Sequence, residues 1–208
     1  MKLQKVHLAL LHVNSPEMPA MVSEDAYTNS FKHLQRKKES LVARTLLNDL
    51  CQIVFGSSLL SLNFRKSPLG QPLLDIGYCS ISHSNGWVFV AVSDSPVGVD
   101  IELLEQREIE ALSVAFDRAT WEKIQGDALL ILQAFSEKEA VSKLRGTGFT
   151  EDPKTIKPTP SEHLHVGKVE ITENETYIFT VGTPLNAELN FVKCDKNSRL
   201  VMLKSRWI

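Results

Sequence analysis

Val97-Gly98-Val99-Asp100-Ile101-Glu102 is the stretch of sequence that decides how this chain folds. Its alternation predicts a strand whose apolar side chains face one side while Asp100 and Glu102 face the other. Two neighbouring carboxylates repel each other unless they share a cation. The stretch therefore predicts a strand that carries a charged functional group on one face.

A second stretch, residues 135–143, reads Phe-Ser-Glu-Lys-Glu-Ala-Val-Ser-Lys and predicts a helix. Glu139 and Lys143 lie four residues apart and so share a face of that helix. With Asp100 and Glu102, Glu139 would complete a set of three carboxylates. Mg²⁺ prefers oxygen ligands from carboxylates and substrate phosphates. Asp100, Glu102 and Glu139 are therefore candidates to hold Mg²⁺ against a phosphorylated substrate, with Mn²⁺ as an acceptable substitute.

Each motif has a plainer interpretation when it is taken alone. An Asp-x-Glu pair is common on the polar face of a half-buried strand. A Glu–Lys pair four residues apart is commonly a solvated ion pair, and both residues point away from Val141 on the apolar side. Neither motif alone specifies a function.

Further motifs in a fixed order change that interpretation. Gly70-Gln71-Pro72 and Ser82-His83 precede the acidic strand, and Arg44-Thr45-Leu46-Leu47 precedes both. Together with the two stretches above, they resemble the 4′-phosphopantetheinyl transferases, in the longer form of the surfactin-synthetase type. The resemblance runs from about residue 32 to residue 149. Residues 150–208 carry no matching motif.

The resemblance implies a reaction, a donor substrate and a partner. Phosphopantetheine would move from coenzyme A to a serine of an acyl- or peptidyl-carrier protein, and adenosine 3′,5′-bisphosphate would leave. Fatty-acid, polyketide and peptide pathways all use such carriers, and the sequence does not distinguish among them.

The resemblance also implies roles for individual residues. The catalytic group would consist of Asp100, Glu102, Glu139 and Lys143. Coenzyme A would be held by Lys32, Arg44, Thr45, Gly70, Gln71, Pro72, Ser82 and His83. The family usually has Lys or Arg between the Gly and the Pro, and Gln71 supplies no charge there. Basic residues at 32–44 are candidates to compensate, although Lys37-Lys38-Glu39 is equally typical of a solvated helix face.

The order of elements indicates two similar α/β lobes. Residues 6–13 read as a strand, 31–55 as a helix, and 78–82 and 88–92 as a hairpin around Asn85-Gly86. The order restarts with a strand at 97–102, helices to about 145, and strands near 166–171, 177–181, 187–194 and 199–204. We therefore predict an α+β fold with an N-terminal lobe at 1–96 and a C-terminal lobe at 97–208. The family resemblance implies an intramolecular pseudo-dimer of these lobes with coenzyme A between them.

Composition narrows the classes of function. The net charge of −2 gives no case for nucleic-acid or membrane binding, and no apolar run approaches 18 residues. The three cysteines have no metal-binding spacing and suggest reduced thiols, so we expect a cytoplasmic protein. We also expect a monomer. Two alternatives stay open, namely a Mg²⁺-dependent nuclease and a degenerate module that binds carrier proteins without catalysis.

Overall fold

The computed structural model describes residues 4–16, 31–104, 109–172, 175–184, 186–194 and 199–203. The helices are α2 (Leu34–Phe55), α3 (Arg118–Ile124) and α4 (Ala128–Arg145), with 3₁₀ turns η1 (Ile109–Ala115) and η2 (Gly148–Thr150). The strands are β1 (Gln4–His12), β2 (Arg65–Lys66), β3 (Pro72–Leu73), β4 (Tyr78–Ser84), β5 (Trp87–Ser93), β6 (Gly98–Leu103), β7 (His163–Thr172), β8 (Glu175–Thr183), β9 (Ala187–Cys194) and β10 (Arg199–Leu203). The predicted α+β class is confirmed.

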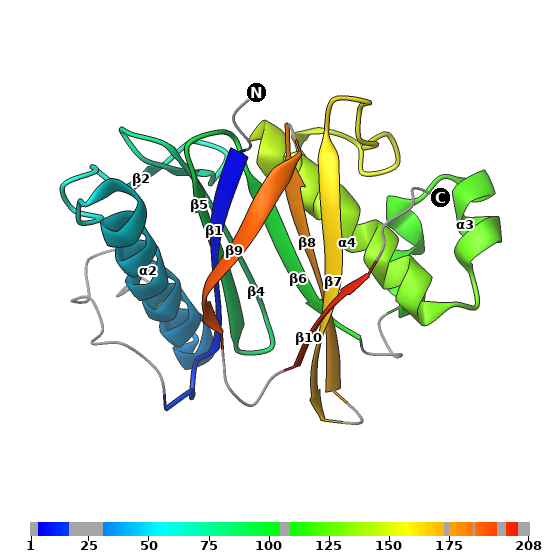
Figure 1. The fold of residues 1–208 in the computed structure, drawn as a ribbon. Coiled ribbons are helices and arrows are strands. Elements are labelled where there is room, and N and C mark those ends of the chain that lie inside the picture. Colours follow the sequence, from blue (N-terminus) through cyan, green and yellow to red (C-terminus); the bar gives the residue numbers. More distant parts are fainter. Residues whose placement is uncertain are drawn as a thin grey trace.

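Two four-stranded sheets form the centre of the molecule. One has the strand order β4-β5-β1-β9 and the other β10-β7-β8-β6, and β2 pairs with β3 in a separate ribbon. Figure 1 shows α2 on one side of these sheets and α3 and α4 on the other. β9 follows the C-terminal strands in the sequence but pairs in parallel with β1. The first sheet therefore includes a strand from beyond residue 97, and the division into lobes at that residue stays a prediction.

Alternation along the strands divides the core into three clusters. On β1, Ala9 and Leu11 pack toward α2, whereas Val6, Leu8 and Leu10 join a cluster with strands of the second sheet. A third cluster lies between the second sheet and α3 and α4. β1 and β5 are thus apolar on both faces, which explains why β5 is buried along its whole length.

The β4–β5 hairpin is the one predicted from Asn85-Gly86. Both residues have positive φ, 46° and 86°, as a two-residue type I′ turn requires. Ser84 pairs with Trp87 across the turn, and the register continues to Tyr78 and Ser93. The turn chemistry therefore sets which β4 side chains face the neighbouring sheet.

Three serines on one face of β4 connect the two sheets, and we call them the serine seam. Ser80 Oγ accepts from Val99 N at 3.0 Å, and Ser84 Oγ accepts from Leu103 N at 3.1 Å. Between them, Ser82 Oγ donates to a carboxylate oxygen of Asp100 at 2.9 Å. Side chains thus replace a backbone ladder between β4 and β6, and they hold the acidic strand in register.

Gly98 allows α4 to approach β6 unusually closely. A Cβ on Gly98 would lie 2.0 Å from Ala140 O and 2.4 Å from Leu144 N, both backbone atoms of α4. Gly182, the partner of Gly98 on β8, also faces Ala140. The glycine of the Gly-x-Asp-x-Glu motif therefore sets the distance between the acids of β6 and those of α4.

The described residues contain no helix that is both long and apolar enough to cross a bilayer.

Candidate active site

Asp100 lies at the centre of the predicted site and is almost completely buried. Its side chain is 2% exposed, at the point where β6 meets the serine seam and α4. Oδ1 accepts from Ser82 Oγ at 2.9 Å and from Lys143 Nζ at 2.7 Å. Oδ2 is also buried, and no described residue offers it a hydrogen bond. A buried carboxylate oxygen without a partner is costly, so this position suits a further cation.

Lys143 contacts Asp100 of the other motif rather than forming a solvated pair with Glu139. Its ammonium lies 2.7 Å from Asp100 Oδ1 and also donates to Ser82 Oγ at 3.0 Å. Close packing of α4 on Gly98 makes this reach possible. The two motifs that the sequence placed about forty residues apart therefore meet in one cluster.

Burial changes the proton affinity of the other two acids. Burial, and then the neighbouring Asp100 carboxylate, raise the pKa of Glu102 to about 8. Burial also raises the pKa of Glu139 to about 6, although Lys143 lowers it. Carboxyl groups that resist ionisation in a hollow lined with acids are typical of functional sites.

The donor set fits a hard divalent cation in its chemistry. Asp100, Glu102 and Glu139 offer carboxylate oxygens, and one of these oxygens is buried without a partner. Within the described ranges, no three acidic, histidine or cysteine side chains are gathered closely enough to hold a metal ion as they stand. Lys143 supplies the counter-charge to Asp100 in this arrangement.

A branched cleft leads from the acids across β4 to α2. The largest hollow, of about 780 Å³, is lined by Asp100, Glu102, Glu139, Lys143 and residues of β4 and α2. Hollows of about 300 Å³ and 190 Å³ adjoin it, and Ile81 lines all three. Three cationic side chains, Arg36, Arg44 and Lys66, line the 300 Å³ branch together with the His83 imidazole.

His83 lies between that cationic branch and the acids. Arg36 Nη1 is 3.0 Å from its Nδ1 and 3.2 Å from its Nε2. Burial lowers the pKa of His83; Arg36 and Lys143 lower it further, whereas Glu39 raises it. His83 thus lies on the wall of the cleft, as expected for a group that contacts a ligand.

The Gly70-Gln71-Pro72 segment lies at the other end of the cleft. Gly70 and Pro72 line the 300 Å³ branch, and Gln71 lines the 190 Å³ branch with Glu139 and Lys143. The Gln71 side chain packs where a Cβ on Gly146 would lie, beside the end of α4. Lys66 pairs with Pro72 across the β2–β3 ribbon and brings a positive charge to this end. Lys66 was not among the predicted ligand residues. It lies only six residues before Pro72, a separation short enough for a hairpin to bring the two together.

Two predicted ligand residues are not brought into the cleft. Thr45 is buried in α2, and its hydroxyl donates to Leu41 O at 2.9 Å. Lys32 is exposed and does not line the three hollows. Arg44, by contrast, lines the cationic branch with its guanidinium carbon 5.3 Å from the centre of the Phe64 ring.

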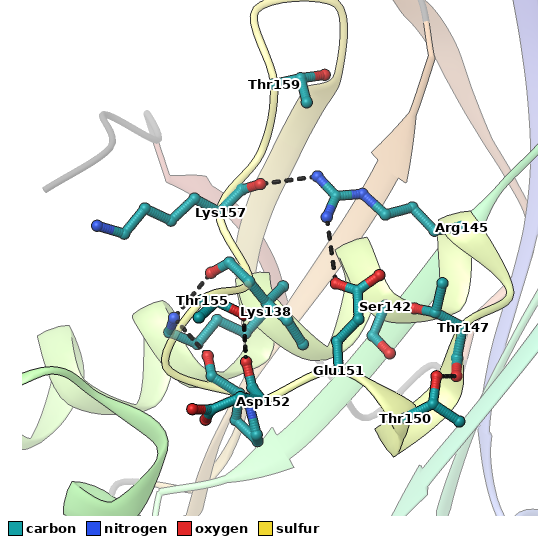
Figure 2. A network of polar contacts seen from close by, with 12 residues as sticks. Lys138, Ser142, Arg145, Thr147, Thr150, Glu151, Asp152, Thr155, Lys157 and Thr159 are labelled. Carbon is teal, nitrogen blue, oxygen red and sulfur yellow. Dashed lines mark hydrogen bonds and ion pairs between the residues drawn. The ribbon is translucent and has the colours of Figure 1, made fainter.

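Lys138, the first lysine of the helix motif, faces the 151–162 segment instead of the acids. Its ammonium donates to Pro153 O at 2.9 Å and to Ile156 O at 2.8 Å. In Figure 2, Arg145 reaches the same segment through Lys157 O and Glu151. The two cations fix a proline-rich segment to the outer side of α4. In the helix motif, Lys138 therefore has a structural role, whereas Glu139 and Lys143 face the cleft.

Comparison with known proteins supports the resemblance that the motifs indicate. No family model matches the chain. The 4′-phosphopantetheinyl transferase gsp of Aneurinibacillus migulanus is 36% identical over 66 residues, 31% of this chain and 28% of that protein. The 4′-phosphopantetheinyl transferase psf-1 of Bacillus pumilus is 24% identical over 133 residues, 60% of this chain and 57% of that protein. The matches thus span 28% and 57% of the length of these two relatives. The predicted resemblance to 4′-phosphopantetheinyl transferases is confirmed.

Proposed function

We propose that this chain transfers 4′-phosphopantetheine from coenzyme A to a serine hydroxyl of an acyl- or peptidyl-carrier protein. The apo-carrier becomes the holo-carrier, and adenosine 3′,5′-bisphosphate is released. One observation carries the proposal. A cluster of three acids and Lys143 opens into a cleft whose far branch is lined by cations, in a chain similar to two named transferases. A polyphosphate ligand needs both environments.

The cationic branch would bind the phosphates of the nucleotide. Arg36, Arg44, Lys66 and His83 line it, and they can supply charge-assisted hydrogen bonds to phosphate oxygens. Binding there would direct the pyrophosphate toward Asp100 and Lys143 along the same cleft. Alignment of this kind accounts for much of the catalysis of phosphoryl transfer.

Asp100, Glu102 and Glu139 would hold Mg²⁺ or Mn²⁺, which neutralises negative charge on the pyrophosphate when bound. Glu139 would accept the proton of the carrier serine. A carboxyl with a pKa near 6 is largely ionised at neutral pH yet still basic enough for this role. The serine oxygen forms a bond to the phosphorus that carries pantetheine, and the bond to the bridging oxygen breaks. Lys143 would neutralise the charge that develops on the leaving group.

The two-lobed organisation belongs to this proposal. The cleft runs between elements of the first sheet and elements of the second, as expected if lobes at 1–96 and 97–208 form an intramolecular pseudo-dimer. We further propose that the protein acts as a monomer in the cytoplasm, where the thiols of Cys51, Cys79 and Cys194 stay reduced.

Ligand-dependent unfolding tests the proposal against a nuclease. Thermal unfolding would be followed with coenzyme A, and separately with a DNA duplex, at a fixed Mg²⁺ concentration. The proposal predicts a rise in Tm with coenzyme A and no change with DNA, because a chain with a net charge of −2 has no long-range attraction for a duplex. A rise with DNA alone would support the nuclease and contradict the proposal.

A further inference from the structure

Glu39 is a buried acid within the basic segment of α2. The sequence suggested that residues 37–39 form a solvated face, and for Glu39 this is wrong, because its side chain is only 5% exposed. Residue 39 precedes Val42, Ala43 and Leu46 by three, four and seven positions, so it falls on the apolar face of the helix. A buried carboxyl at that place requires polar partners.

The partners of Glu39 are the hairpin turn and His83. Oε1 accepts from Gly86 N at 3.1 Å, across 47 residues of sequence, and from Gln35 Nε2 at 3.2 Å. Oε2 lies 3.7 Å from His83 Nδ1 and 3.9 Å from Arg36 Nη1. One carboxylate therefore fixes the end of the β4–β5 hairpin to α2 and faces a ring that lines the cleft.

The β4–β5 turn also packs against side chains of β1 and α2. A Cβ on Gly86 would lie 2.7 Å from His12 Nε2 and 3.0 Å from Gln35 Nε2. His83 lies between Ser82 and Ser84, two residues of the serine seam, and both of these serines hydrogen-bond to β6. His83 is thus fixed from both directions, by the seam on one side of β4 and by Glu39 on the other.

We propose that Glu39 is a positioning residue that holds the His83 imidazole in place, with a carboxylate beside its Nδ1, for contact with a phosphate group of the donor substrate. Arg36 of α2 and Lys143 of α4 disfavour a positive charge on the His83 ring. Asp100 and Glu102 of β6 line the same hollow. Glu39 offsets the two cations. The inference rests on the proposed function for the identity of the ligand, but its effect on His83 exists without any ligand.

The test uses Glu39→Gln, which keeps an oxygen to accept from Gly86 N but removes the negative charge. NMR titration of the ligand-free protein should place the pKa of His83 about one unit lower than in the wild type, as expected for the loss of a charge 3.7 Å away in a half-solvated site. Calorimetry should give a Kd for coenzyme A about tenfold higher, whereas kcat at saturation should change less than twofold. Glu39→Asp keeps the charge and should restore most of both values.

Glu188→Gln is the matched control, because it removes an exposed acid of β9, the edge strand farthest from β4 in the first sheet, whose partner Lys5 Nζ is 3.9 Å away. It should leave the pKa of His83 and the Kd unchanged. The inference is overturned if Glu39→Gln leaves the pKa of His83 unchanged, or if the pKa falls without any loss of affinity. If the wild type does not bind coenzyme A, the proposed function fails, and so does the role of Glu39 in phosphate binding. If Glu39→Gln still lowers the pKa of His83 in that case, the effect of Glu39 on the His83 ring stands.

Discussion

Replacing Gly98 with alanine should damage catalysis far more than it damages folding. The new Cβ would lie 2.0 Å from Ala140 O and 2.4 Å from Leu144 N, whereas ordinary contact begins at 3.4 Å. Both are backbone atoms, so α4 must retreat by more than an ångström and carry Glu139 and Lys143 away from Asp100. Overpacking of this kind costs about 1–3 kcal/mol of unfolding free energy. A displacement of about 1 Å at the reacting groups costs on the order of 100-fold in rate.

Urea unfolding and the rate of carrier modification would be measured on the same Gly98→Ala preparation. Gly126→Ala is the control, because Gly126 has φ +94° with open space where the Cβ would lie. Backbone strain there should cost about 1–2 kcal/mol but leave α4 in place and the rate nearly unchanged. The reasoning is refuted if Gly98→Ala keeps near-normal turnover, or if Gly126→Ala loses as much activity for the same loss of stability.

Asp100→Ala should stay folded, since the partly exposed Lys143 keeps the attraction of Glu102 and Glu139 after its partner Asp100 is lost. Transfer should fall by orders of magnitude, and excess coenzyme A should not restore it. Near-normal turnover in Mg²⁺ would contradict the metal assignment. In the metal-free protein, the pKa values of Glu102 and Glu139 are raised to about 8 and about 6. The folded state therefore binds more protons than the unfolded chain. The free energy of unfolding should fall as pH rises from about 4.5 to about 8. Added Mg²⁺ should stabilise the protein more at pH 8 than at pH 5, because it needs ionised carboxylates, and equal stabilisation at both would count against the site. Gln71→Lys should tighten coenzyme A binding by about 1.5–3 kcal/mol at low salt and by less at high salt, and calorimetry showing no gain would indicate that Lys66 already supplies the charge.

The local features of the fold could be predicted because each has a short-range physical cause. Asn85-Gly86 requires a tight turn, and its positive φ values follow from that requirement. Alternation on β6 correctly separates the buried Val99 and Ile101 from the acids. Both motif stretches were therefore placed on the right elements. The suggestion that they share one site came from the chemistry of their side chains, and the resemblance strengthened it.

Features that depend on distant partners could not be predicted. The parallel pairing of β9 with β1 joins strands about 180 residues apart. The alternating pattern of a strand does not indicate which other strand it pairs with. The spacing of Glu39 from Val42 and Leu46 indicated a buried position, but its hydrogen-bond partner Gly86 lies 47 residues away and could not be predicted. Thr45 lies in a matching motif, yet its hydroxyl bonds within its own helix.

Intact mass spectrometry of a purified apo-carrier protein is the most direct test of the central claim. The carrier would be incubated with this protein, coenzyme A and Mg²⁺, in parallel with the Asp100→Ala variant. The account predicts a gain of one phosphopantetheine on the carrier serine with the wild type and none with the variant. An unmodified carrier across acyl- and peptidyl-carrier types, from a folded protein that binds coenzyme A, would contradict it.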